Sequence, residues 1–301
     1  MGFGSEPIDV KGRLIAEKAT EEDGFGRGLI VDTYWDVPSL FSPFVSLPSP
    51  EPLISAANSC GTAMSRLVYS TVIDSYPDDG DQSYQGNPSF DAIDSISGET
   101  SNWIGQAADS FEQAYQVPAK RVIPNQFLVV RCMKQALEAQ ADLWKTTHDS
   151  IHQIANSTMG ALEVVNDKGP AEWEFALTVA AAVVGVGVTI ASGGGAGPIV
   201  LTVAAGAFSS GAVAAGNSGD EKPEDKGKYK VSGDSPKEIV SSMRTAISQL
   251  VSDTYTAEEK IRKGMVDLTA AINGDGDRPD SRNLGFVEPL LVRTPEFGAH
   301  V

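Results

Sequence analysis

Hydrophobic residues recur at heptad spacing along two stretches of the chain. The first row consists of Val130, Leu137, Trp144, Ile151, Thr158 and Val165, with Met133, Ile154 and Ala161 three residues later in their repeats. The second consists of Val240, Met243, Ile247, Leu250, Thr254, Ala257, Ile261, Gly264, Leu268 and Ala271. This spacing is typical of helices that pack nearly parallel to one another. It predicts two long helices, over residues 125–165 and 236–273, that pack together.

Local signals set the expected ends of these helices. Ser235-Pro236-Lys237-Glu238 has the form of a capping box with proline in the first turn, and Gly274 follows the last periodic residue. Pro118 and Pro124 are expected to interrupt the chain before the first long helix, and Gly169-Pro170 to close it.

Shorter helices are expected before the long ones. Ser49-Pro50 is a credible helix start, and an apolar face follows it up to Asp74. An acidic, solvated loop then runs to Pro88, and short helices are expected around Phe90–Ile96 and over residues 101–116. Residues 1–48 are rich in glycine, proline and aromatic residues. They predict an irregular strap with its aromatic side chains on the protein surface and a short strand over Leu29–Trp35.

The predicted fold class is therefore mainly α, an elongated helical bundle. Its segments are an irregular N-terminal segment (1–48), a helical region (49–169), an apolar helical hairpin (170–217), a charged linker (218–234), a C-terminal bundle helix (235–273) and a tail (274–301). The tail is polar and then apolar, and is expected to lie back on the body.

The hairpin segment has no charged residue from Phe175 to Gly219. Its two arms flank Gly193-Gly194-Gly195-Ala196-Gly197 and are rich in alanine, glycine and valine, a composition that suits close helix packing better than membrane anchoring. Three roles stay open for residues 171–216. They form a hairpin in or beside the bundle, insert into a membrane as part of a pore-forming effector, or provide a surface for self-association.

Charge and cysteine content exclude several classes of function. The formal net charge of −17 argues against nucleic-acid binding, which needs a basic surface. Residues 1–18 lack an apolar core of signal-peptide length, so no Sec-type signal is expected. The two cysteines, Cys60 and Cys132, form one disulfide bridge if the protein leaves the cytoplasm, or are two free buried thiols.

The sequence gives little support for a catalytic site. His148 and His152 have the spacing of a zinc-protease helix, but Asp149 stands where that chemistry needs glutamate, and the only other histidine is His300 in the tail. The heptad predicts His148 beside the seam and His152 on the outer face. There is no Gly-x-Ser-x-Gly elbow. We therefore expect no catalytic site, no metal and no cofactor.

One turn carries a family resemblance. Trp103 and Gly105, followed by Ala107, Ala108 and Phe111, resemble the Trp-x-Gly turn of WXG-family substrates of type VII (ESX) secretion systems. Tyr255 and Glu259 resemble the family's second motif, Tyr-x-x-x-Asp/Glu, and being four residues apart they project from one helix face. Simpler alternatives are a core tryptophan that closes a turn and an ordinary helix-surface pair.

The resemblance implies a WXG-type helix-turn-helix and a composite export signal made of Trp103, Gly105, Tyr255 and Glu259. It covers roughly residues 50–273 and is closer to the longer, EspA/EspB-like ESX-secreted proteins of actinobacteria than to the small WXG proteins. The two motifs here are 152 positions apart (255 − 103), a departure from the small proteins that leaves the role of Tyr255 open. The expectation is a non-enzymatic protein, secreted or in the cell envelope. Its expected partners are the secretion ATPase and a WXG-type chain or a second copy.

Overall fold

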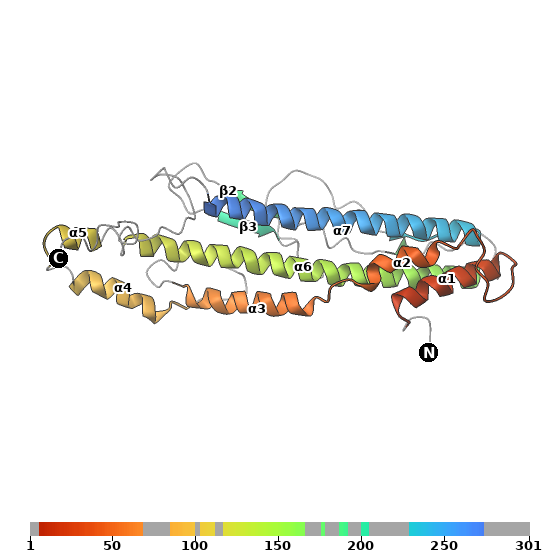
Figure 1. Ribbon diagram of the computed structural model, residues 1–301, viewed down its shortest axis with the longest axis horizontal. Coiled ribbons are helices and arrows are strands. Elements are labelled where there is room, and N and C mark those ends of the chain that lie inside the picture. The colour runs from red at the N-terminus through yellow and green to blue at the C-terminus, as the bar shows by residue number, and fades with distance from the viewer. Residues whose placement is uncertain are drawn as a thin grey trace, which may run out of the picture. The chain divides into compact units, whose positions relative to one another are not determined.

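The computed structural model describes residues 6–68, 85–99, 103–111, 117–165, 176–177, 187–191, 200–204 and 229–273. These residues are mainly helical, which confirms the predicted class in its coarse form. The helices are α1 (Ile8–Glu22), α2 (Val37–Val45), α3 (Glu51–Arg66), α4 (Pro88–Glu99), α5 (Gln106–Phe111), α6 (Val117–Val164) and α7 (Pro236–Asn273), as labelled in Figure 1. The expected tail and most of the expected linker lie outside the described residues.

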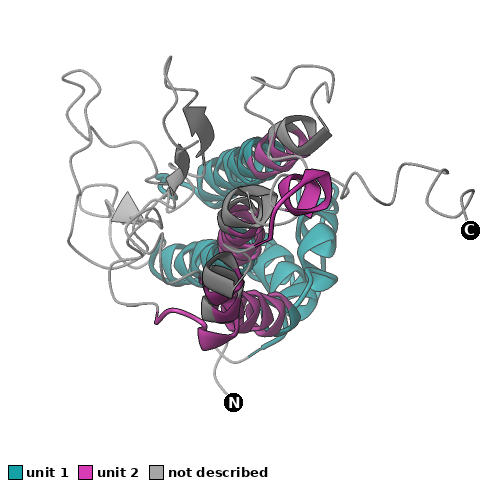
Figure 2. Cartoon of the chain, turned by 90° about the vertical axis from the view of Figure 1, so that its left-hand side faces the viewer, with its two compact units in different colours: residues 1–52, 139–186, 205–260 teal, residues 53–138, 187–204, 261–301 magenta. Residues whose placement is uncertain are grey.

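The chain divides into two compact units, coloured separately in Figure 2. Unit 1 comprises residues 1–52, 139–186 and 205–260, and unit 2 comprises residues 53–138, 187–204 and 261–301. Helices α6 and α7 contribute residues to both units. The boundaries predicted from the sequence differ from those of the two units. The amino-acid composition of a long helix does not change where the helix passes from one unit to the other, so composition alone does not show that boundary.

Unit 1 has a hydrophobic core shared by four helices. Its buried residues come from α1 (Ile8, Ile15, Ala16, Ala19), α2 with the preceding turn (Tyr34, Val37, Phe41, Phe44), α6 (Ile151, Ile154, Ala155, Met159, Ala161, Leu162) and α7 with the residue before its cap (Val231, Ile239, Val240, Met243, Ala246, Ile247, Leu250). Gly12 permits a close approach of α1 and α2, because a Cβ there would meet the Phe41 ring at 2.7 Å.

Helix α7 follows its sequence prediction closely. It spans the predicted residues, and the apolar row is buried from Val240 to Leu268 except at Thr254, which is half-buried. The backbone N–H of Glu238 donates to Ser235 Oγ at 3.3 Å, and the Glu238 carboxylate accepts from the backbone N–H of Asp234 at 2.8 Å. The start of α7 is therefore capped from both sides, as the sequence indicates.

Helix α6 is longer than predicted, and the expected interruption before it is wrong. Pro118 stands in the first turn, where its missing N–H costs nothing, and Pro124 lies inside the helix without ending it. The predicted row is buried at Ile151, Ile154 and Thr158. In the first half the buried row is instead Cys132, Ala136, Ala139 and Leu143. A straight α-helix drifts by roughly 20° per heptad, which moves a row over this length.

The irregular N-terminal strap predicted from the sequence is also wrong. Residues 6–48 contain α1 and α2, and residues 29–35 form no strand. Of the aromatic residues expected on the surface, Tyr34, Phe41 and Phe44 are buried in the core of unit 1, whereas Trp35 is exposed. This segment is therefore part of the hydrophobic core of unit 1 and not a surface strap.

Unit 2 contains α3, α4, α5 and the first part of α6. Met64 of α3 and Val68 after it pack with Phe127 of α6, with Leu67 and Val130 half-buried beside them. Asn87 joins the start of α4 to the end of α3: its backbone N–H donates to Val68 O at 2.8 Å and its side-chain amide donates to Arg66 O at 2.7 Å.

The helical hairpin predicted for residues 170–217 is not what the described part of that segment shows. Strands β2 (Gly187–Ala191) and β3 (Val200–Ala204) pair antiparallel, and β1 (Ala176–Leu177) pairs antiparallel with β4 (Tyr229–Lys230). Valine, isoleucine and threonine, which favour extended backbone, make up more than half of β2 and β3 and explain the correction. The rest of the segment lies outside the described residues.

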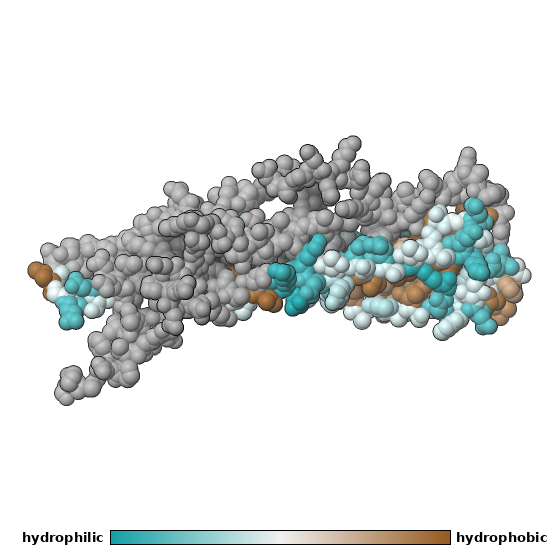
Figure 3. Space-filling view, turned by 90° about the horizontal axis from the view of Figure 1, so that it is seen from above, coloured by the Kyte–Doolittle hydropathy of each residue, from teal (hydrophilic) through white to brown (hydrophobic). Residues whose placement is uncertain are grey.

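Figure 3 colours the described residues on one face of the molecule by hydropathy. On the face seen in Figure 3, hydrophilic residues are interspersed with smaller groups of hydrophobic ones. No helix in the part of the chain that the structure describes is long and apolar enough to span a membrane.

Candidate functional site

The Trp103 turn has a defined local geometry. Gly105 adopts a φ of +113°, in the region that favours glycine, and no atom lies within 4 Å of a Cβ built there. Its carbonyl accepts the backbone N–H groups of Ala108 at 3.0 Å and Asp109 at 3.2 Å, which starts helix α5. The Trp103 and Phe111 rings meet edge to face, with centroids 6.0 Å apart and an interplanar angle of 68°.

This turn displays its side chains to solvent. Trp103 is 59% exposed and Ile104 is 97% exposed. The alternative of a core tryptophan is therefore wrong: Trp103 has one flank against Phe111 and the rest of its ring in water. Contact of adjacent large hydrophobic side chains with water is unfavourable, and such residues are candidates for binding another molecule.

The second motif lies on the exposed side of α7. Tyr255 is 68% exposed, and Glu259 is half-buried one turn later. Val251, one turn earlier, is also exposed, whereas Ala257 is buried. Thr254 holds this part of α7 to α6 through a hydroxyl contact with Thr147 at 3.1 Å. The Tyr255 side chain thus projects from a helix that is fixed from its other face.

The two motifs fall in different compact units. Trp103 and Gly105 belong to unit 2, and Tyr255 and Glu259 belong to unit 1. Each motif has an exposed aromatic side chain of its own. Their action as one composite signal stays a prediction.

The two cysteines are free thiols in the structure. Cys60 on α3 is half-buried and Cys132 on α6 is buried. Burial raises the pKa of the Cys132 thiol to about 11, so very little of it is thiolate at neutral pH. Cys132 therefore has the properties of a packing residue and not of a nucleophile.

The histidine pair of α6 has an arrangement that the sequence did not predict. The His148 and His152 rings lie 4.6 Å apart, but His148 is exposed and His152 is half-buried, the reverse of the heptad prediction. His152 instead faces Lys11 of α1, whose Nζ lies 3.1 Å from His152 Nδ1. Within the described ranges no three His, Cys, Asp or Glu side chains come together as metal ligands; His300 lies outside them.

Lys11 is the residue that sequence reasoning missed. The signal for it was present, because Ile8, Ile15 and Ala19 have helical spacing within the segment predicted to be irregular. Reading that row as a helix would have put a lysine on its apolar face. A buried lysine needs polar partners, and two of them, His152 and Asn156, are on α6.

No family model, curated protein sequence or solved structure matches this chain.

Proposed function

We propose that this protein is a non-enzymatic substrate, or a secretion-associated component, of a type VII (ESX) secretion system. It would leave the cytoplasm without a cleavable signal peptide and act at the cell envelope or in the medium. The observation that carries the proposal is the Trp103 turn, which resembles the family's Trp-x-Gly motif in sequence and combines an exposed tryptophan with a positive-φ glycine.

The turn is suited to recognition by another protein. Tryptophan and tyrosine are over-represented among the residues that dominate binding energy at protein interfaces, where their truncation costs roughly 2 kcal/mol or more. Gly105 permits the sharp turn that leads into α5, and Phe111 limits the motion of the Trp103 ring. A side chain held in this way loses little conformational freedom when it is bound.

Tyr255 and Glu259 are proposed as the second part of the export signal. The tyrosine supplies an exposed ring and the glutamate a negative charge one turn away on the same helix face. A secretion ATPase that reads both motifs would need an apolar pocket for each ring. A basic group near the second pocket would face Glu259.

At the level of fold, we propose that the helices form an elongated bundle with a WXG-type helix-turn-helix around the Trp103 turn. The shared core of α1, α2, α6 and α7 supports the bundle, and the short helices α4 and α5 on either side of the turn support the motif. A WXG-type partner chain or a second copy of this chain is the proposed covering for the exposed ring.

The experiment that tests the function is an export assay. The full chain is expressed in an ESX-competent actinobacterium with its secretion ATPase intact or deleted, and culture filtrate, membrane and cytosol are probed. Appearance in the envelope or the medium only with the ATPase is the expected result. Retention in the cytosol of both strains would overturn the proposal.

A further inference from the structure

Helix α1 contributes to the core of unit 1 through a face whose buried residues are apolar except for Lys11 in the first turn and Thr20 in the last. The residues of that face that join the hydrophobic core are Ile8, Ile15, Ala16 and Ala19, and Lys11 lies among them with no solvent-exposed surface. Burial favours the neutral form of an amine, and it lowers the pKa of Lys11 below its ordinary value although Glu6 opposes the shift. A lysine at this position therefore depends on the groups that its ammonium reaches.

Two of those groups belong to helix α6. Lys11 Nζ donates to Asn156 Oδ1 at 2.7 Å and lies 3.1 Å from His152 Nδ1. Asn156 is one turn after His152, so both partners stand on one side of α6. Two polar contacts from α6 thus hold the first turn of α1.

The contact with His152 requires one protonation state of the imidazole. An ammonium has three donors and no acceptor, so His152 Nδ1 must offer its lone pair and the ring proton must be on Nε2. Protonation of His152 converts Nδ1 to a donor. The hydrogen bond is then lost, and two cations face each other at hydrogen-bond distance.

We propose that Lys11, His152 and Asn156 form an acid-sensitive latch that holds α1 on α6. Above the range in which His152 titrates, the latch is closed. In mild acid, protonated His152 repels Lys11, and α1 loosens from the core and exposes the apolar face that Ile8, Ile15 and Ala19 form. This device is independent of the export proposal.

The surroundings of His152 set the pH range. Burial, Lys11 and His148 lower the pKa of His152, in that order of size, and Asp149 on the same helix opposes them. On the α1 side the other nearby charge is Glu6, which favours the charged form of Lys11. Because the folded-state pKa is lowered, the contribution of His152 to stability is present above its ordinary value near 6.5 and is lost as pH falls through the folded-state value.

Amide hydrogen exchange of the full chain between pH 7.5 and 4.5 tests the latch, with rates corrected for intrinsic pH dependence. Protection of the α1 amides, residues 8–22, should fall about tenfold for each pH unit between 6.5 and the folded-state pKa of His152. His152→Gln keeps an acceptor that does not titrate, and it should abolish the step. His148→Gln, on the exposed neighbour, should keep it. No step in the wild type, or an equal step in His152→Gln, would overturn the proposal.

A second measurement holds even where His152→Gln folds poorly. Lys11→Met replaces the buried amine by an apolar side chain of similar length, and NMR of labelled histidines reports the pKa of His152 directly. The variant should raise the pKa of His152 toward 6.5 and shrink the exchange step. A pKa of His152 unchanged by Lys11→Met would show that the two groups are not coupled and would contradict the latch.

Discussion

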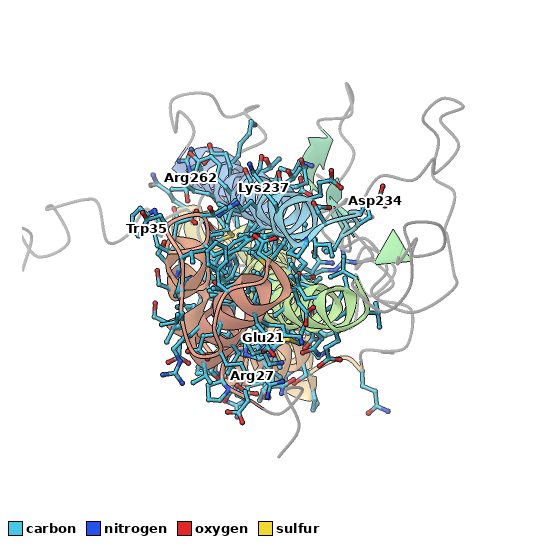
Figure 4. All side chains as sticks on the ribbon, turned by 90° about the vertical axis from the view of Figure 1, so that its right-hand side faces the viewer. Glu21, Arg27, Trp35, Asp234, Lys237 and Arg262 are labelled. Carbon is cyan, nitrogen blue, oxygen red and sulfur yellow. The ribbon has the colours of Figure 1, made fainter. Side chains whose placement is uncertain are left out.

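Two turns of this protein expose a tryptophan, and they are built in different ways. The turn between α1 and α2 in unit 1 exposes 70% of Trp35, which Figure 4 shows at the surface. Its neighbour Tyr34 is fully buried, and the Tyr34 hydroxyl donates to Asp23. Arg244 of α7 donates to both carboxylate oxygens of Asp36, at 2.7 and 3.2 Å, and to Thr33 O at 3.0 Å.

The turn before α5 in unit 2 is simpler. Gly105 shapes its backbone, and the Trp103 ring has an edge contact with Phe111. Ile104, next to Trp103, is almost wholly in water. Around Trp35, the buried Tyr34 and the contacts of Arg244 hold the chain in place. Around Trp103, the large side chains of Trp103 and Ile104 are exposed instead.

The difference indicates two uses of an exposed tryptophan. Trp35 is exposed beside groups that stabilise the fold, so its exposure follows from packing Tyr34 and pairing Asp36. Trp103 and Ile104 contribute little to a core, and we infer that they are exposed for contact with another molecule. Substitutions in the first turn should therefore change stability, and substitutions in the second should change binding and export.

The largest expected effect on stability is at Tyr34. Tyr34→Ala leaves a cavity in the core of unit 1 and removes the hydrogen bond to Asp23, so we expect a loss of about 3–5 kcal/mol in the free energy of unfolding. Ile104→Ala should change it by less than about 0.5 kcal/mol. Urea unfolding followed by circular dichroism measures both. A similar loss for the two variants would break the distinction between the turns.

A smaller effect is expected at Arg244. Arg244→Ala removes the ion pair with Asp36 and the bond to Thr33 O, and since both charged side chains are about one-third exposed we expect a loss of roughly 1 kcal/mol. Arg244→Lys keeps the charge but cannot make the bidentate contact with Asp36, so it should recover only part of the lost stability. Unfolding at low and high salt measures the effect, and full recovery by lysine would show that charge alone matters.

Effects of similar size are expected from changes in backbone conformation. Gly105→Ala meets no neighbouring atom but forces alanine into a positive φ, which should cost about 1–2 kcal/mol. Gly160→Ala, inside α6 and also free of neighbours, should stabilise by roughly 0.5–1 kcal/mol. Thermal unfolding of the two variants gives the signs. Stabilisation by Gly105→Ala would mean that the turn does not need glycine.

The sequence predicted some elements better than others for physical reasons. Helix α7 has an unbroken apolar row and a capping box, so its limits and buried face follow directly. The helices of residues 8–45 were missed because glycines and prolines around them are typical of loops, although Pro38 lies in a first turn and Pro43 is accommodated inside α2. The pairing of Lys11 with His152, 141 residues apart, depends on tertiary packing that no local pattern contains.

For the candidate site, the sequence located the Trp103 and Tyr255 motifs but not their exposure. A tryptophan in a turn between two short helices is equally compatible with a core position, and only the fold distinguishes an exposed from a buried side chain. The strands β2 and β3 illustrate the opposite case. A long charge-free stretch was read as helical from its alanine and glycine content, although valine, isoleucine and threonine favour strands locally.

The most direct test compares Trp103→Ala with Trp35→Ala in the export assay. Both variants remove an exposed tryptophan from a turn, and circular dichroism confirms that each is folded. The account predicts that Trp103→Ala stays in the cytosol while Trp35→Ala is exported as the wild type is, in a strain with the secretion ATPase. Normal export of Trp103→Ala, or equal loss of export in both variants, would contradict the claim that the Trp103 turn is the recognised signal.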